Sequence, residues 1–348
     1  MALRAGATGD PVAETEAWFV RNGLPWFVPA ERAQVQRALS PRRTVPLLAL
    51  SGLAALGVAL LLTWVSSDLG LERSRLLSFG PASLLTIAGL TLLFYGATAL
   101  RGRPILAYTL KHSAASLRTF MTLVTRALPL LLVFMTFLFI NAEVWQMSAY
   151  LDGGALWVTV LLFMVLGVIF FVVRLPEEIE RADDELDDAR VVEVVQGTPM
   201  AEEARRLSVH EGALSAESRV SGYERVNLTL VLLIAQTVQA LLLSLAVFAF
   251  FLVFGSITMK EAIANAWIGD GGPVRNLEVL PNLSVELLQV SIFLGAFAGL
   301  YFTVYAVTDE VYRTQFFSRV QRDLERAIAV RAAYVVWHQV HGRQRAEG

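Results

Sequence analysis

The residues best placed for chemistry lie in the stretch FLFINAEVWQMSA, residues 137–149, where an apolar run meets Asn141, Glu143 and Gln146. A carboxylate at the edge of such a run either lies in water at a membrane interface or turns into the protein, where partial loss of solvation raises its pKa. We predict that Glu143 turns inward and forms, with Asn141 and Gln146, the outer mouth of a polar pathway for a proton or cation. The alternative is an ordinary interfacial glutamate. Trp145 suits an outer aromatic belt.

Two later apolar segments carry polar side chains at helical spacing. Gln236 and Gln239 share one broad face of the first segment, and Tyr301, Tyr305 and Asp309 follow one another on the second. These faces either line the same pathway or form interhelical hydrogen bonds, worth about 0.6 kcal/mol each, that hold a bundle together. Hydrogen bonding is the commoner use. Because one hairpin would join the two segments, we predict that Gln236 faces the interior within reach of Tyr301 or Tyr305.

Small residues form a stripe on the second of these segments. Ser291, Gly295 and Gly299 are spaced four apart, and such a stripe lets another helix approach closely. The stripe could join two copies of the chain into a homo-oligomer. Packing against a helix of the same chain is the more frequent use, and we favour it.

The elements that position these residues are predicted to be membrane-spanning helices. The chain has 348 residues, of which 55% are hydrophobic and only 17% charged, so lipid is the expected solvent and the expected partner. A helix needs about 20 apolar residues to cross a core of about 30 Å. Six windows satisfy this length: Val45–Val65, Pro81–Leu100, Ala127–Met147, Ala155–Val173, Leu228–Val253 and Leu287–Val307.

The basic residues predict an orientation, because lysine and arginine collect in cytoplasmic loops. Of the 29 such residues, 25 fall in alternate segments, which places both chain ends in the cytoplasm. The predicted fold is therefore all-α, a six-helix transmembrane bundle with cytoplasmic helical extensions. Its parts are a leader (1–44), spans one to four (45–173), an acidic helical linker (174–227), spans five and six (228–307) and an amphipathic C-terminal helix (308–348).

The segments outside the bilayer carry their own signals. In the leader, Asp10 and Pro11 can start a helix, Gly23 can end it and Pro29 can start another. The aromatic rings around that break either lie at the inner headgroups or pack on the bundle. In the linker, Thr198 suits a helix cap. We also predict that acids after span four pair with arginines after span six, namely Glu180, Asp184 and Asp188 with Arg319, Arg322 and Arg326.

Several classes of function are disfavoured by the sequence. A net charge of −2 argues against a nucleic-acid partner, and the absence of cysteine excludes disulfides and thiolate chemistry. The motifs of common hydrolases, zinc proteases, phosphate loops and dinucleotide-binding folds are absent, so we expect no enzyme, cofactor or metal site. His338 and His341 have a spacing that can bind a metal, but no pair of carboxylates lies near them in the chain.

The stretches LPLLLVFMTFLFINAEVWQ, AFFLVFG and AGLYFTVYAVTDEVYR resemble a group of uncharacterised multi-pass membrane proteins of actinobacteria, across spans three to six. The resemblance implies a bacterial host and a helical membrane fold, and no mechanism. Buried polar faces and an interfacial acid are what a solute route requires, so the sequence favours a small channel or transporter for an ion or small solute. The alternative is a scaffold or signalling partner in the bacterial plasma membrane that acts through its cytoplasmic helices.

Overall fold

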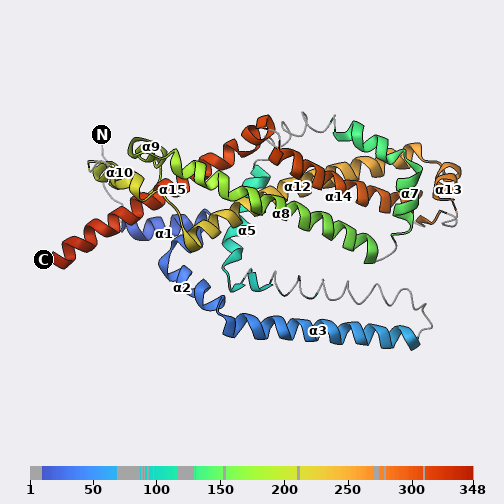
Figure 1. Cartoon of the computed structure of the whole chain (residues 1–348), viewed down its shortest axis with the longest axis horizontal. Helices are drawn as coiled ribbons and strands as arrows, with labels where there is room; N and C mark the ends of the chain where they lie inside the picture. Colours follow the sequence, from blue (N-terminus) through green and yellow to red (C-terminus); the bar gives the residue numbers. More distant parts are fainter. Residues whose placement is uncertain are drawn as a thin grey trace, which may run out of the picture.

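The structure is a computed structural model, and it is almost entirely helical (Figure 1). It describes residues 10–68, 87, 89, 91, 94–96, 98–115, 129, 131–151, 154–209, 212–269, 274–277, 280–308 and 310–347. Side chains at 306–321 lie outside this description. The only β structure among the described residues is a short antiparallel hairpin of β1 (Asn276–Leu277) and β2 (Leu280–Ser284).

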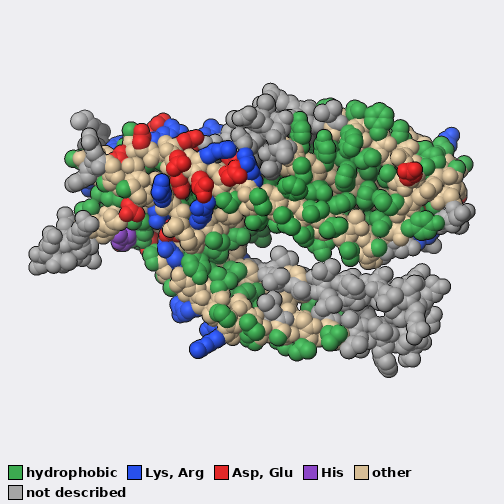
Figure 2. All heavy atoms as spheres, in the orientation of Figure 1, with side chains coloured by type: hydrophobic (Ala, Val, Ile, Leu, Met, Phe, Trp, Pro, Cys, Tyr) green, Lys and Arg blue, Asp and Glu red, His purple; other side chains and the backbone are tan. Residues whose placement is uncertain are grey.

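Three described helices are long and apolar enough to cross a membrane. They are α8 (Gly154–Asp184), α12 (Gly222–Thr258) and α14 (Val285–Thr308), and they cover predicted spans four, five and six. The three helices pack against one another, and apolar side chains cover much of their outer surface (Figure 2). These properties support insertion into a membrane.

Predicted span three is wrong as a single straight helix. The helical stretch Leu131–Phe139 is followed by a separate helix, α7 (Ala142–Ala149), at an angle of 72°. The two pieces together form a fourth candidate span. Asn141 lies between them in an extended conformation, and its side chain accepts a hydrogen bond from the Glu143 N–H at 2.8 Å. Asn141 therefore caps a new helix instead of continuing the old one.

Predicted span one is also helical, and α3 (Pro41–Asp68) covers it. This helix is set apart from the α8–α12–α14 bundle (Figures 1 and 2). Its leucines are correspondingly exposed, with Leu50 69% and Leu53 66% accessible. Most of predicted span two, Pro81–Leu100, lies outside the described residues.

The contact between α12 and α14 depends on the small-residue stripe of α14. A Cβ atom on Gly295 would lie 2.9 Å from the Ser244 carbonyl oxygen and 3.0 Å from the Phe248 Cβ on α12. A Cβ on Gly299 would overlap the Ser244 hydroxyl. The stripe is thus filled by a helix of the same chain, as favoured from the sequence, and this face of α14 is not free for a second copy.

Helix α7, helix α13 (Glu261–Ile268) and the β hairpin cover one end of the bundle. The buried Glu286 carboxylate at the start of α14 binds Arg275 beside this hairpin, with 2.8 Å between Oε1 and Nε. No sequence pattern had predicted the hairpin.

At the opposite end, segments from the whole length of the chain form what we call the helical module (Figure 1). It consists of the N-terminal end of α12, the described C-terminal half of α15 (Glu310–Glu347) and several shorter elements. These are α1 (Pro11–Arg21), η1 (Pro25–Phe27), α2 (Pro29–Ala38), α5 (Gly102–Ala115), α9 (Asp188–Val194), α10 (Ala201–Leu207) and α11 (Ala213–Ala216). Charged side chains gather over this end (Figure 2).

Helix boundaries in the leader follow the predicted signals. The Asp10 side chain accepts from the Val12 N–H at 3.1 Å and caps α1, Gly23 lies beyond its end with φ +73°, and Pro29 begins α2. In the linker, the predicted cap Thr198 is wrong by two residues, because α10 begins at Ala201 and the Thr198 hydroxyl donates to the Val195 carbonyl oxygen.

Candidate functional site

The predicted outer mouth does not turn into the protein. The Glu143 side chain is exposed, as are Asn141 and Gln146, so the inward orientation predicted for Glu143 is wrong. The reason is local, because the bend at Asn141 rotates α7 away from the axis of the preceding helix. Glu143 lies in the first turn of α7, where a carboxylate is favourable to the helix dipole.

Trp145 occupies the interior position in its place. Its ring is fully buried, and Nε1 donates a hydrogen bond to the Phe139 carbonyl oxygen at 2.7 Å. The ring also meets Phe139 and Trp267 edge to face. The predicted place of Trp145 in an outer aromatic belt is therefore wrong. Its hydrogen bond to Phe139 instead stabilises the bend between the two helices.

The intramembrane polar faces converge only in part. Gln236 is fully buried, so its predicted interior orientation is confirmed, but neither polar atom of its side chain has a hydrogen-bond partner among the described residues. Tyr301 is exposed and stacks on Phe134 and Tyr305. The predicted tyrosine face therefore presents at least one ring to the outside of the bundle.

The remaining members of the predicted pathway add no second buried group. Gln239 is half-buried, and Asp309 lies outside the described residues. Ser291, in the small-residue stripe, is fully buried, and its hydroxyl has no hydrogen-bond partner within the residues that the structure describes.

The cavity within the bundle is apolar. It has a volume of about 430 Å³ and lies between α8, α12 and α14. Its lining includes Phe163, Phe171 and Phe248, and it contains no charged side chain. The hydroxyls of Ser244 and Thr303 at its wall donate to carbonyl oxygens of their own helices, at 3.0 and 2.8 Å. A cavity of this chemistry suits hydrocarbon better than a hydrated ion.

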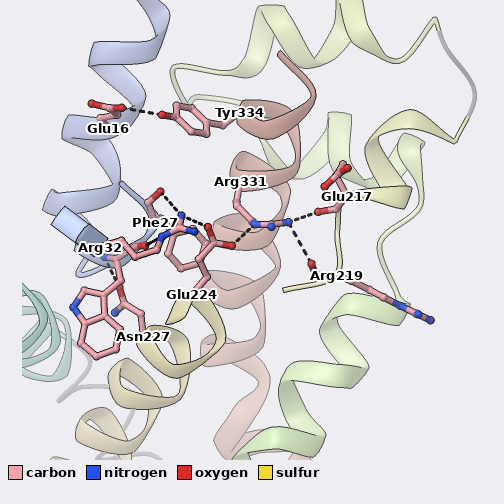
Figure 3. Close-up of polar contacts among 10 residues, drawn as sticks. Glu16, Phe27, Arg32, Glu217, Arg219, Glu224, Asn227, Arg331 and Tyr334 are labelled. Carbon is pink, nitrogen blue, oxygen red and sulfur yellow. Dashed lines mark hydrogen bonds and ion pairs between the residues drawn. The ribbon is translucent and has the colours of Figure 1, made fainter. Parts of the chain in front are cut away.

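The densest polar network of the described chain lies in the helical module, where α12 begins (Figure 3). Asn227, which is fully buried, fixes the leader with both ends of its amide. Its Oδ1 accepts from the Trp26 N–H at 2.9 Å, and its Nδ2 donates to the Gly23 carbonyl oxygen at 3.0 Å. One side chain of α12 thereby satisfies backbone groups about 200 residues away.

Glu224, one turn before Asn227, is the centre of this network. Its carboxylate pairs with Arg32 of α2 through one oxygen and with Arg331 of α15, at 2.7 Å, through the other (Figure 3). The Glu224 side chain is 7% exposed and that of Arg331 is 12% exposed. Removing one member of a buried ion pair leaves an uncompensated charge, which makes the group a strong constraint on conformation.

Arg331 also reaches the linker, which brings a fourth segment into the network. Its Nη1 donates to the carbonyl oxygens of Glu217 at 2.5 Å and Arg219 at 3.3 Å. About one turn further along α15, the Tyr334 hydroxyl donates to Glu16 of α1 at 2.8 Å, and the Tyr334 ring meets Phe19 edge to face. Burial raises the pKa of Tyr334.

The leader's aromatic residues belong to this same packing. Phe19, Trp26 and Phe27 are buried, so of the two interpretations of the leader, packing on the protein is correct for these three rings. The Trp26 Nε1 also donates to the Leu100 carbonyl oxygen at 3.0 Å.

Asp183, in the last turn of α8, is a second buried acid and lies beside the module. One of its carboxylate oxygens accepts from the Val220 N–H at 3.4 Å, and the other has no hydrogen-bond partner in the described part of the chain. Loss of solvation raises the pKa of this carboxyl from 3.8 to about 6, against the opposing influence of the Val220 hydrogen bond and of Arg225. Its charge therefore changes close to physiological pH.

The predicted pairing of acidic and basic faces is wrong in its partners. Glu180 binds Arg225 at 2.6 Å, and Asp188 accepts from the backbone of α11. Asp184 and Arg322 are exposed, Arg326 donates to the Gln196 carbonyl oxygen, and the Arg319 side chain lies outside the described part. An ion pair between linker and C-terminal helix does exist with reversed charges, from Arg190 to Glu325 at 3.0 Å, and this pair raises the pKa of Arg190.

Within the described residues, no group of three or more His, Asp or Glu side chains could hold a metal ion. His338 is exposed, and His341 stacks on Trp337. Comparison of the chain with models of protein families, with curated proteins and with solved structures gives no match.

Proposed function

We propose that this protein is a membrane scaffold or signalling partner whose working part is the helical module. The observation that carries the proposal is the network around Glu224, which joins the leader, the linker, α12 and α15 through buried charges. Buried ion networks add little net stability, and in some proteins they select one arrangement of helices. The described bundle, in contrast, has an apolar pocket between α8, α12 and α14.

We further propose that six spans anchor the module in a bacterial plasma membrane, with the module in the cytoplasm. The additional spans are α3 and the segment that ends near Leu100. The support for this orientation is that leader, linker and C-terminal helix, which the arginine distribution assigns to one side, contact one another at one end of the bundle.

Two variants distinguish a working module from a working bundle in cells that lack the native chain. Glu224→Gln removes the central charge of the module and leaves the contacts among α8, α12 and α14 unchanged. Gln236→Leu removes the buried amide of the bundle and leaves the contacts of the module unchanged. We expect Gln236→Leu, and not Glu224→Gln, to reverse the phenotype of deletion at equal protein abundance. The opposite result would overturn the proposal.

A channel or transporter for an ion or small solute is the second candidate. Gln236 favours it, because its amide has no partner among the described residues, and a buried amide without a partner in a membrane-crossing helix is costly unless it has a function. Flux of protons, monovalent cations and chloride into liposomes that contain the purified protein tests this candidate. Flux that disappears in Gln236→Leu would establish the second function over the first.

A further inference from the structure

A basic pocket lies at the corner where α2, α3 and the chain before α5 meet. Its volume is about 390 Å³, and it is lined by Gln34, Arg37, Ala38, Arg43, Thr98, Ala99 and Arg101. On the face drawn in Figure 2, basic side chains project at the corner between α2 and α3. The Tyr95 hydroxyl donates to the Ala38 carbonyl oxygen at 2.6 Å and thereby holds the two walls of the pocket together.

The charges around this pocket are unbalanced. The Arg101 guanidinium is held by Glu31 at 2.5 Å and by the Gln34 side chain at 3.0 Å. Arg37 and Arg43 have no carboxylate partner in the part of the chain that the structure describes. The pocket therefore has an excess of two positive charges, and it is complementary to an anion that presents several oxygen atoms.

The backbone at Arg101 is held in an unusual conformation. Its φ of 56° is the only positive value for a residue other than glycine among the described residues. A left-handed backbone at such a residue costs about 1 kcal/mol or more, and it persists where surrounding contacts enforce it. The Arg101 side chain contacts Glu31 and Gln34, so its guanidinium is oriented at the pocket wall before any ligand arrives.

The position of the pocket specifies the source of the anion. Arg43 lies two residues before Val45, where the apolar surface of α3 begins, and Val45 is 63% exposed. An anion bound here would lie at the level of lipid headgroups, with an exposed apolar helix beside it for hydrocarbon chains. Inorganic phosphate has no apolar part that could contact that surface.

We propose that this pocket binds the phosphate of an anionic phospholipid from the cytoplasmic leaflet. Arg37 and Arg43 supply the charge, Arg101 is the pre-oriented donor, and the acyl chains follow α3. The proposal rests on the membrane orientation given under Proposed function, and it is independent of whether the module signals or the bundle transports.

Native mass spectrometry of the full-length protein, released from micelles doped with phosphatidylglycerol or phosphatidylcholine of identical chains, tests the proposal. We expect the wild type to retain phosphatidylglycerol in preference. The double variant Arg37→Gln/Arg43→Gln should retain about tenfold less of it, because each basic residue near an anionic surface contributes to binding. The matched control is Arg21→Gln/Arg103→Gln, which removes the same charge from two exposed arginines outside the pocket and should behave as wild type.

Each alternative outcome overturns the assignment. Equal retention of the two lipids by the wild type, or equal loss in both double variants, would show that the pocket does not select an anionic lipid. Displacement of bound lipid by millimolar inorganic phosphate would identify a soluble anion as the ligand. If the double variant elutes differently from the wild type in gel filtration, it is misfolded, and Arg43→Lys replaces it. Arg43→Lys should bind less phosphatidylglycerol than the wild type and more than the double variant.

Discussion

Trp145 donates a hydrogen bond to the Phe139 carbonyl oxygen at 2.7 Å, across the 72° bend that separates α7 from the helix before it. The donor and the ring are both buried, so Trp145→Phe removes the bond and leaves a buried carbonyl oxygen without this partner. We expect a loss of about 1 to 3 kcal/mol. Thermal unfolding in detergent measures it. Trp157→Phe, on a side chain that is 62% exposed, is the control and should change stability by less than about 0.5 kcal/mol.

Glu224→Gln preserves the shape of the side chain and removes the charge between Arg32 and Arg331. Because the two guanidinium groups then face each other without a counter-ion, we expect the module to lose about 3 kcal/mol and the leader to detach. Hydrogen exchange at the Trp26 amide and limited proteolysis of the leader report this change.

The control for Glu224→Gln is Glu202→Gln, which breaks an exposed pair with Arg205. Exposed pairs contribute about 0 to 1 kcal/mol, so this variant should resemble the wild type. Unchanged exchange at Trp26 in Glu224→Gln would contradict a structural role for the network.

The raised pKa of Asp183 makes the stability of the folded protein depend on pH. Its pKa is 3.8 when unfolded and about 6 in the folded protein, so between these values the folded state binds more protons. The stability contributed by this group therefore falls as pH rises from about 4 to about 6, and stays at its lower level above that window.

Asp183→Asn removes this dependence, because a neutral amide needs no proton. We expect the variant to be more stable than wild type at pH 7.5, by about 1 to 3 kcal/mol, and similar to it at pH 4. Melting temperatures at the two pH values give the comparison. The neighbouring exposed acid offers Asp184→Asn as a control, and a gain of equal size in both variants would attribute the effect to net charge alone.

Gly295→Ala tests the close approach of α12 and α14. The added methyl group would meet the Ser244 backbone oxygen, which cannot rotate away, so the helices must separate. We expect a loss of about 1 to 3 kcal/mol. Gly57→Ala on α3 is the matched control, since nothing lies within 4 Å of a Cβ there, and this change should be neutral or slightly stabilising. Equal melting temperatures for the two variants would count against close packing.

Local sequence patterns correctly predicted features that depend on helical periodicity, namely long apolar helices, a close helix contact and a buried side chain. The apolar windows located the three long apolar helices α8, α12 and α14, the spacing of Gly295 and Gly299 located a helix contact, and Gln236 was correctly assigned to the interior. Each of these follows from helical periodicity and from the cost of polar groups in lipid. Asp10 and Pro29 gave helix starts for the same kind of reason.

Two features were missed for different physical reasons. The bend had a readable signal, because Asn141 followed by Glu143 in a first turn is a helix start, yet the surrounding apolar run favoured one continuous span. The Glu224 network had little signal of its own. Its partners Arg32 and Arg331 are 192 and 107 residues away, and no local pattern shows which of many charged residues will meet.

The contact of Tyr334 with Glu16 and Phe19 has a consequence for how the chain is made. Glu16 and Tyr334 are 318 positions apart. At a synthesis rate of about 5 to 20 residues per second, the leader exists for roughly 15 to 60 s before the helix that covers Phe19 is translated. During that interval its apolar side chains are open to chaperones and proteases, so the ribosome must finish α15 before the module can close.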